Sequence, residues 1–351
     1  MRITLRQLLL GIAALAGAGF LVAWAGIINI GASSGHWRIT EWALHWAMQN
    51  YTRTYALLEP EPPPELDAPA RVRRGAGHFE TSCAFCHGSP VRPTPDLGRH
   101  MTPQPPGLKF TARKWDAPEL SRIVKHGIKY TGMPAWIAPQ RDDEVWAMVA
   151  FLRAQGAMSP EDYRAAAFGP PVPEDPVLEG CARCHGVDGG SQGGAFPVLA
   201  GQSEAYLVAT LRAFAQDRRH SGYMQFAVDA LPEEELARMA RYYASRPGLR
   251  EKASSDGSRG AEIALRGIPE AGVPACESCH GASPRRNLAY PHLAGQDAGY
   301  IADQLRLMKK RARGGTAYGP VMQRIAGRLP DDAIDTVAAY YSAAGAGAAA
   351  K

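Results

Sequence analysis

Three five-residue stretches decide how this chain is interpreted: Cys83-Ala84-Phe85-Cys86-His87, Cys181-Ala182-Arg183-Cys184-His185 and Cys276-Glu277-Ser278-Cys279-His280. Together they use all 6 cysteines of the 351-residue chain. Cys-x-x-Cys-His is the attachment pattern of c-type haem, because two cysteines on one tight turn can form thioethers to the two vinyl groups of a porphyrin. The adjacent histidine then points its imidazole at the iron. The sequence therefore predicts three haem c groups.

Disulfides and zinc sites are the alternatives for these cysteines. Six cysteines outside the cytoplasm could form three disulfides, but disulfides would leave a histidine after every pair unexplained. Zinc sites usually draw on more thiolates or imidazoles at set spacings, whereas each motif offers a single triplet. A thioredoxin-like site would need a strand before the motif, and no strand is predicted there.

The spacing of the motifs reveals an internal repeat. Their first cysteines recur after 98 and 95 residues (83 to 181 and 181 to 276). Each repeat contains the motif, a Pro/Gly-rich loop, a helix, a loop with a methionine and a closing helix. Apolar residues recur at helical spacing in the three closing helices, which are 142–152, 233–244 and 331–342. The predicted fold class is all-α, with an N-terminal transmembrane helix before three haem domains in tandem.

The N-terminal segment predicts the cellular location. Arg2 and Arg6 precede an uncharged stretch from Leu8 to Ile28, and about 20 apolar residues are enough to cross a bilayer. Basic residues before the stretch place the N-terminus in the cytoplasm. We therefore expect an anchor in the bacterial inner membrane, with the haem domains on the periplasmic side. A cleaved signal peptide ending at Ala23-Trp24-Ala25 is the alternative.

Proline-rich and polar breaks divide the rest of the chain. We predict a membrane anchor (1–31), a juxtamembrane helix and Pro-rich spacer (32–67), a first haem unit (68–158), a linker (159–176), a second unit (177–247), a linker (248–258), a third unit (259–345) and a tail (346–351). The proline-rich linkers would let the first unit move, whereas the short later linker favours a tight pair of second and third units. The juxtamembrane helix carries Trp37, Trp42 and Trp46, which favour a membrane interface. Packing on the first unit or on a membrane partner is the alternative.

The sixth iron ligand separates an electron carrier from a reactive haem. Each unit has one methionine in a predicted loop 39 to 46 residues after its motif histidine. A thioether ligand favours ferrous iron and raises the potential, and it closes the iron to other molecules. The predicted ligand pairs are His87 with Met133, His185 with Met224, and His280 with Met322.

Three other side chains compete for the sixth position. Met101 is a rival to Met133 in the first unit. His126 and His220 lie near the ligand loops, and they would give bis-histidine haems of lower potential. Other methionines lie on helical faces and are interpreted as core residues.

With these motifs located, the chain resembles class I cytochromes c across all three units. The second and third units resemble the two halves of cytochrome c4, a dihaem electron carrier. They share the matching stretches Pro197–Gln202 and Pro291–Gln296 and the closing pairs Tyr242-Tyr243 and Tyr340-Tyr341. The first unit is similar to single-haem membrane cytochromes with a Thr-Gly-Met-Pro-Ala-Trp loop, here Thr131 to Trp136.

The resemblance implies a role for one proline in each unit. In that family a loop proline offers its backbone carbonyl to the haem-ligating histidine and so orients the ring. By this match the prolines are Pro106, Pro197 and Pro291. The second unit departs from the pattern, because the proline-rich stretch 173–176 stands where an N-terminal helix is expected. We expect a neighbouring unit to cover its closing helix.

Three haem irons, each with histidine and methionine ligands and no open position, indicate electron transfer. No residue is predicted to be catalytic. The net charge of +5 is mild and gives no reason to expect nucleic acid. The expected partners are redox proteins of a periplasmic respiratory chain: a quinol-oxidising complex or soluble cytochrome as donor and a terminal oxidase as acceptor. The alternative is an electron-accepting subunit of a periplasmic dehydrogenase. A peroxidase or thiosulfate-oxidising cytochrome would need an open iron position, and three methionine loops argue against that.

Overall fold

The computed structural model describes residues 4–172, 174–249, 256–283 and 286–346. Within these ranges the regular structure is helical, apart from two isolated β-bridges. This confirms the predicted all-α class. The α-helices in chain order are α1 (Leu5–Trp24), α2 (Arg38–Ala56), α3 (Pro69–Ser82), α4 (Ala84–His87), α5 (Asp96–Arg99), α6 (Leu108–Thr111), α7 (Ala117–His126), α8 (Asp142–Ala154), α9 (Pro160–Ala167), α10 (Pro176–His185), α11 (Glu204–Ala215), α12 (Met224–Val228), α13 (Glu233–Ala244), α14 (Arg259–Arg266), α15 (Glu277–His280), α16 (Ala298–Lys309), α17 (Gly319–Arg328) and α18 (Asp331–Ala346).

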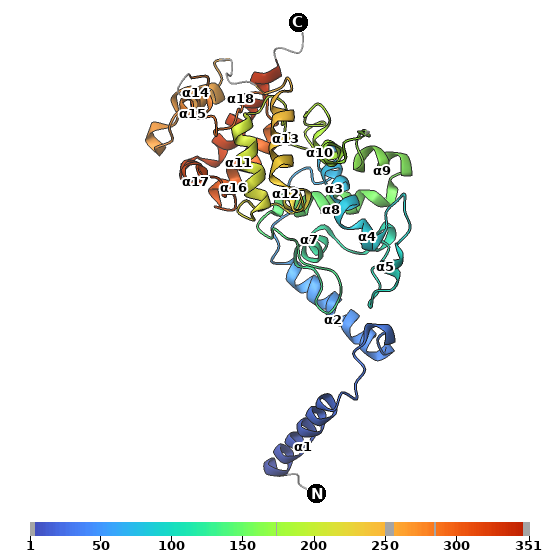
Figure 1. Cartoon of the computed structure of the whole chain (residues 1–351). Coiled ribbons are helices and arrows are strands. Elements are labelled where there is room, and N and C mark those ends of the chain that lie inside the picture. Colours follow the sequence, from blue (N-terminus) through green and yellow to red (C-terminus); the bar gives the residue numbers. More distant parts are fainter. Residues whose placement is uncertain (1–3, 173, 250–255, 284–285, 347–351) are drawn as a thin grey trace.

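The N-terminal helix α1 stands apart from the other helices (Figure 1). Its first turn is closed by a capping box, in which Thr4 and Gln7 each accept the other's backbone N–H. None of its residues is buried. Its length and apolar composition suffice to cross a membrane, as those of a signal sequence also would. The helix ends at Trp24, before the end of the apolar stretch at Ile28.

The predicted juxtamembrane helix is α2, and one half of it packs on α7 of the first unit. Arg122 on α7 donates to the Tyr51 hydroxyl at 2.7 Å and to the Glu59 carboxylate at 3.0 Å. The other half of α2 is exposed, and it carries Trp42 and Trp46, whose rings stack with centroids 6.5 Å apart. The helix is therefore fixed to the first unit while its tryptophans stay uncovered.

In the first and third units, the helix before the motif crosses the closing helix at a glycine. Gly75 of α3 lies against α8, where a Cβ would overlap the carbonyl oxygen of Ala147. Gly260 of α14 meets α18 in the same way, and a Cβ there would lie 2.7 Å from the carbonyl oxygen of Thr336. Only glycine allows the two backbones to come so close. The crossings bury the apolar faces predicted for both closing helices.

The second unit is built differently, because α10 runs directly into its own motif. Its closing helix α13 packs on α11, and the Tyr243 hydroxyl donates to the Gly186 carbonyl at 3.1 Å. The first unit covers the motif instead of this closing helix. Gly77 of α3 faces the sulfur of Cys184, and Arg74 Nε donates to the Ala195 carbonyl at 2.7 Å. We expected a neighbouring unit to cover the closing helix, but the neighbouring first unit covers the cysteine motif instead.

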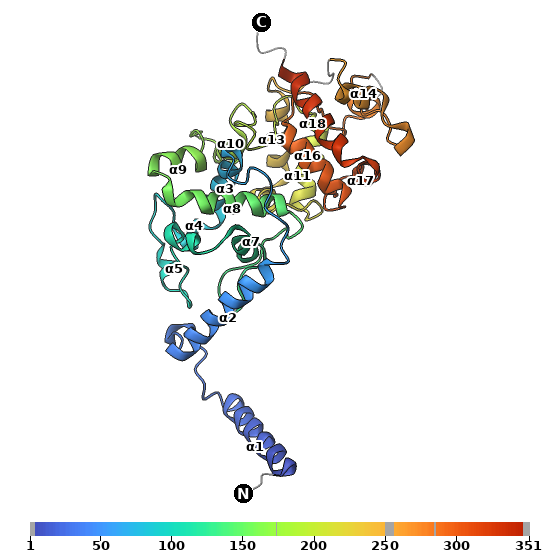
Figure 2. The same ribbon diagram turned by 180° about the vertical axis from the view of Figure 1, so that it is seen from behind.

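The segment predicted as a linker, 159–176, contains the helix α9, which extends the first unit. Tyr163 and Ala167 of α9 are fully buried in the core of that unit, and the Tyr163 hydroxyl donates to Glu80 at 2.6 Å. The second unit lies between the first and the third in both views (Figures 1 and 2). The first unit is thus packed on the second and does not hang free on a linker.

Candidate functional site

Each cysteine motif lies on a single helical turn. His87 N–H donates to the Cys83 carbonyl at 3.0 Å, and His280 N–H donates to the Cys276 carbonyl at 2.9 Å. The second motif forms the end of α10, which stops at His185. Residues three apart on a helix lie on one face, so the two sulfurs of each motif point to the same side as one porphyrin edge requires.

Each motif histidine makes the same contact with a proline carbonyl. Its Nδ1 lies 2.9 Å from the oxygen of Pro106 in the first unit, 3.3 Å from that of Pro197 in the second and 2.9 Å from that of Pro291 in the third. A carbonyl only accepts hydrogen bonds, so Nδ1 carries the proton. Nε2 is then the unprotonated nitrogen that can bind a metal. These are the three prolines that the resemblance predicts.

The protonation states at the motifs suit covalent haem. Burial lowers the pKa of the motif histidines against the raising effect of the proline carbonyls, and it takes that of His185 to about 4. The imidazoles are therefore neutral near pH 7, which is the ligating form. Burial also raises the thiol pKa of Cys83 to about 12 and that of Cys181 to about 11. None of the six cysteines forms a disulfide, so two free thiols and a neutral imidazole fit haem c at each motif.

Two methionines of the first unit lie close to one another. Met133 is in a loop, where its N–H donates to Thr131 Oγ1 at 3.1 Å. Met101 has its sulfur 3.9 Å from that of Cys86, and a Cβ on Gly132 would overlap its methyl group. The structure therefore places the rival Met101 beside both the motif and the loop that carries Met133.

The other two predicted ligands lie on helices, where loops had been expected. Met224 is the first residue of α12, and Met322 is on the first turns of α17. The expectation of a loop was wrong because a glycine at or near the start of each helix, Gly222 before α12 and Gly319 in α17, and a proline after each helix made these segments resemble loops in the sequence. Met224 packs against Phe214, Val228 and Leu236.

The two histidines named as rival ligands have partners of their own. His126 Nε2 lies 3.2 Å from the carboxylate of Glu59. His220 Nδ1 lies 3.3 Å from the carboxylate of Asp217. Each of the two imidazoles thus has a carboxylate within ion-pair distance.

A buried carboxylate joins the methionine loops of the first and second units. Glu144 of α8 is 1% exposed, and it accepts from Trp136 Nε1 at 3.2 Å and from the Gly222 N–H at 2.6 Å. Ser221 Oγ donates to it as well, and Arg141 forms an ion pair with it at 2.9 Å. Trp136 follows Met133, and Gly222 precedes Met224, so these contacts hold the two methionine-bearing segments together. We call this interface between the first and second units the Glu144 seam.

An aromatic cluster lies in the same seam. His78 of α3 is buried and packs against Trp136, Tyr223 and Phe226 at centroid distances of 4.9, 4.5 and 6.3 Å. Burial lowers its pKa to about 3. Neither His78 nor Glu144 was singled out from the sequence, because nothing local to either residue shows that a second unit will cover it.

The second and third units are joined by two glutamines that cross the seam in opposite directions. Gln296 accepts the Val198 N–H at 2.8 Å and donates to the Val198 carbonyl at 2.9 Å. Gln202 accepts the His292 N–H at 2.7 Å and donates to the His292 carbonyl at 3.1 Å. Val198 and His292 directly follow the two prolines that contact the motif histidines. Each glutamine thus holds the histidine-orienting loop of the other unit.

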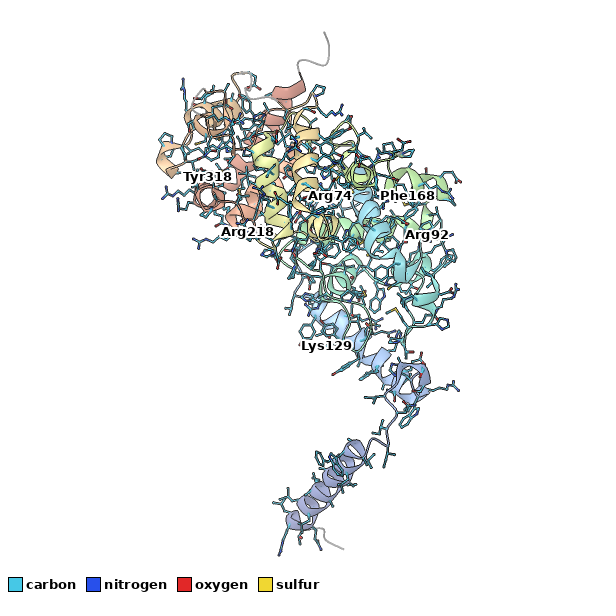
Figure 3. All side chains as sticks on the ribbon, in the orientation of Figure 1. Arg74, Arg92, Lys129, Phe168, Arg218 and Tyr318 are labelled. Atoms are coloured by element: carbon cyan, nitrogen blue, oxygen red, sulfur yellow. The ribbon has the colours of Figure 1, made fainter. Side chains whose placement is uncertain are left out.

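Arg74, labelled in Figure 3, lies where all three units meet. It belongs to α3 of the first unit, donates to the second unit at Ala195 and lies 3.9 Å from Asp303 of α16 in the third. Burial and the nearby Asp143 raise the pKa of Asp303 to about 6 against the opposing charges of Arg74, Arg306 and Arg141.

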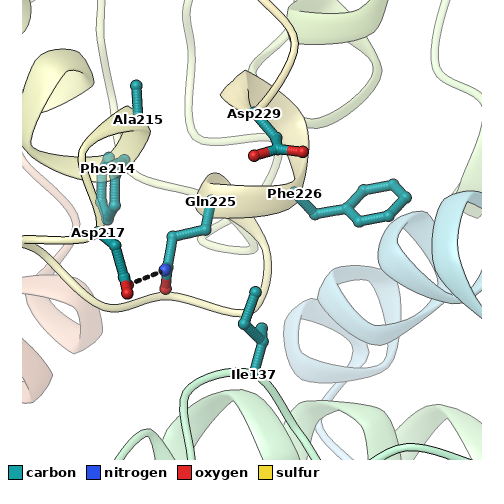
Figure 4. A pocket seen from close by; sticks show the side chains of 7 residues that line it. All are labelled: Ile137, Phe214, Ala215, Asp217, Gln225, Phe226 and Asp229. Atoms are coloured by element: carbon teal, nitrogen blue, oxygen red, sulfur yellow. Dashed lines mark hydrogen bonds between the residues drawn. The ribbon is translucent and has the colours of Figure 1, made fainter.

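A cavity of about 310 Å³ opens beside the first two units (Figure 4). Its lining contains none of the motif cysteines, motif histidines or predicted methionine ligands. Ile137 comes from the first unit and the rest from the second: Phe214, Ala215, Asp217, Gln225, Phe226 and Asp229. Gln225 donates to Asp217 across its wall. The cavity is therefore separate from the predicted haem ligands.

Two family matches and several relatives agree with this chemistry. Residues 70–152 match the family described as Cytochrome C oxidase, cbb3-type, subunit III, and residues 177–246 match the family described as Cytochrome c. The chain is 34% identical over 174 residues to the thiosulfate dehydrogenase electron acceptor of Thiomonas intermedia, covering 48% of this chain and 80% of that protein. It is 34% identical over 164 residues to cytochrome c4 of Pseudomonas aeruginosa, covering 46% and 81%. It is 31% identical over 210 residues to the thiosulfate dehydrogenase electron acceptor of Stutzerimonas stutzeri, covering 57% and 93%.

Proposed function

Because this chain belongs to the c-type cytochromes, we propose that it carries electrons through three covalently bound haems while its N-terminal helix holds it at a membrane. When bound, haem iron supplies the chemistry by changing between its ferrous and ferric forms. The chain's own residues attach, orient and enclose that iron. The observation that carries the proposal is the contact between a motif histidine and a proline carbonyl, which occurs once in each unit.

We assign each unit the same set of roles. The motif cysteines form thioethers to haem, the motif histidines bind iron through Nε2 and the proline carbonyls hold the histidine rings. The methionines give the second iron ligand, with Met133 preferred over Met101 because its loop matches the related membrane cytochromes. The full ligand set is His87 and Met133, His185 and Met224, and His280 and Met322.

The packing of the units supports a relay. Tunnelling rates fall exponentially with distance, so neighbouring haems must be held close. The Glu144 seam joins the loops of the first and second units, and Gln202 and Gln296 join the second and third. Electrons would then pass between the first and third units by way of the second.

We further propose a terminal oxidase as the acceptor in a periplasmic respiratory chain. The support is that residues 70–152 match a family described as an oxidase subunit. The donor would be a quinol-oxidising complex or a soluble cytochrome. The apolar helix α1 supports anchoring in the inner membrane, with the haem units on the periplasmic side.

A second candidate is an electron-accepting subunit of a periplasmic dehydrogenase, whose catalytic centre lies on another chain. It is favoured by two relatives whose names describe electron acceptors of thiosulfate dehydrogenase. Both candidates use the same haem chemistry and differ only in the partner.

Haem counting tests the central proposal. Pyridine haemochrome analysis of the purified full chain should give three haems per polypeptide. Replacing Cys276 and Cys279 together by alanine should reduce this to two, since thioether attachment at one motif is lost. A wild-type value of two or fewer would remove the relay.

Partner identity needs a second experiment. The chain is purified from detergent-solubilised membranes, and the reduced protein is mixed with the complexes that accompany it. Rapid reoxidation by a co-purified oxidase supports the respiratory relay. Reduction by a co-purified dehydrogenase and its substrate, without an oxidase, supports the second candidate instead.

A further inference from the structure

Two arginines in the seam between the second and third units have no acidic partner. Arg219 is 5% exposed, and its guanidinium lies over the Phe214 ring at 4.6 Å. Arg313 of the third unit is half-buried. Within the described ranges no carboxylate forms an ion pair with either side chain, and tyrosines are the groups that favour their charge. Buried charges are normally paired, so this seam lacks an anion.

The hydrogen-bond partners of Arg219 are all neutral groups, and the contacts with a measured distance are long. Its nitrogens lie 3.5 Å from Thr210 Oγ1, 3.4 Å from the Tyr300 hydroxyl and 3.3 Å from Gln304 Oε1. A guanidinium has five N–H groups, and good N–H···O bonds measure about 2.7–3.2 Å. All three contacts are longer than this. Tyr206 is a further hydrogen-bond partner of Arg219, so neutral groups surround this guanidinium and none of its partners is a carboxylate.

The arginines cross the seam reciprocally. Arg219 of the second unit reaches Tyr300 of the third, and Arg313 of the third unit donates to the Tyr206 hydroxyl of the second at 2.9 Å. Gly315 packs so closely on the Arg218 backbone that a Cβ would overlap it. The loops that carry the two arginines are therefore in direct contact, and both charges face the same region.

The positive charge of the two arginines affects the pKa of the neighbouring Tyr206. Burial raises the pKa of Tyr206, but Arg313 and Arg219 lower it, and the result is about 8. Burial and the charge of Arg219 both lower the pKa of Arg313. Two neighbouring cations, one buried and one half-buried, are costly unless an anion compensates them.

We propose that Arg219 and Arg313 together bind one small oxyanion in the seam between the second and third units. A carboxylate suits the planar fork of a guanidinium, which can donate two parallel hydrogen bonds to it. One source is a propionate of a haem in these units, and this source rests on the proposed function. The other source is a dissolved oxyanion such as inorganic phosphate.

The test uses the full, haem-loaded chain in detergent. Arg219→Gln and Arg313→Gln remove the charges, and Arg219→Lys keeps one. Arg218→Gln is the matched control, because Arg218 is the exposed neighbour of Arg219 and lies at the outer surface (Figure 3). Spectroelectrochemical titration gives the midpoint potentials of the haems, and thermal melting gives stability, each in buffers with and without phosphate at equal ionic strength.

A nearby positive charge favours ferrous haem, so both glutamine variants should lower at least one midpoint potential. They should also lower the melting temperature, because the anion would lose its partner. Arg219→Lys should recover part of both effects, and Arg218→Gln should show neither. A shift that is the same in both buffers identifies a propionate. A wild-type response to phosphate that is lost in Arg219→Gln identifies the dissolved ion.

The opposite result would overturn the site. If Arg219→Gln raises the melting temperature, leaves every potential unchanged and shows no effect of phosphate, the arginine was an unpaired buried charge. Haem content is measured on the same samples. Three haems per wild-type chain with this negative result would reject the anion site alone, whereas fewer than three would reject the proposed function.

Discussion

Met133 and Met101 are the two candidate thioether ligands of the first unit. Met133 lies in the loop that the sequence predicts as the ligand loop. Met101 has its sulfur 3.9 Å from that of Cys86. Both satisfy the chemistry of a soft ligand that favours ferrous iron. Which of them binds must be decided by substitution, one residue at a time.

Met133→Leu should lower the potential of one haem and leave the other two unchanged, because leucine removes the sulfur but keeps the volume. Optical redox titration would show this, together with a loss of about one third of the methionine-to-iron charge-transfer absorbance. Met101→Leu is the matched control and should alter neither signal. If the two variants exchange behaviour, Met101 is the ligand.

At the scale of single residues, the sequence predicts the contacts of the motif histidines well. The motif cysteines and histidines follow from a local pattern, and the three proline contacts at 2.9 to 3.3 Å involve the residues that the resemblance names. Glu144 could not be predicted. Its role depends on Ser221 and Gly222, which are far away in sequence and approach only when two units pack.

At the scale of elements, two helix crossings set the shape of the first and third units. Gly75 lets the backbone of α3 touch the backbone of the closing helix α8, and Gly260 does the same for α14 and α18. The apolar periodicity of the closing helices made them predictable, and α8 and α18 begin at the expected Asp142 and Asp331. The helix α9 was not predictable from flanking prolines, because proline is also common at the first helical turn.

Gly75→Ala should destabilise the folded chain by about 1–3 kcal/mol, the usual range for overpacking a tight core. The added methyl group would overlap the Ala147 carbonyl. Thermal unfolding monitored by circular dichroism measures the change. Gly327→Ala is the control, since that glycine lies on α17 with open space around its Cβ position. It should be neutral or stabilising by up to about 1 kcal/mol. Equal behaviour of the two variants would contradict the crossing.

At the scale of the whole molecule, two interfaces of different construction hold the three units together. The seam between the first and second units centres on the buried carboxylate of Glu144. The seam between the second and third uses Gln202 and Gln296, which hold the loops next to Pro291 and Pro197. The sequence shows both glutamines in matching stretches, but it does not show that each one bonds to the opposite unit. That information lies in the packing alone.

Replacing both Gln202 and Gln296 by alanine should lower the free energy of unfolding by about 1–3 kcal/mol for each residue, because buried backbone groups lose their partners. Denaturant unfolding of the full chain measures this. Gln216→Ala is the matched control, since Gln216 is exposed at the end of α11. A double variant as stable as the wild type would show that water replaces the glutamines without cost.

The exchange of glutamines has a consequence for how such a chain can grow. Each of the two units gives the other the same glutamine contact, so the pair is self-complementary and closed. No third copy can join through the same surface. Any additional haem unit must attach by other means. The first unit does so through α3 and the hydrogen bonds of Glu144, so its position at the end of the series follows from the geometry of the pair it joins.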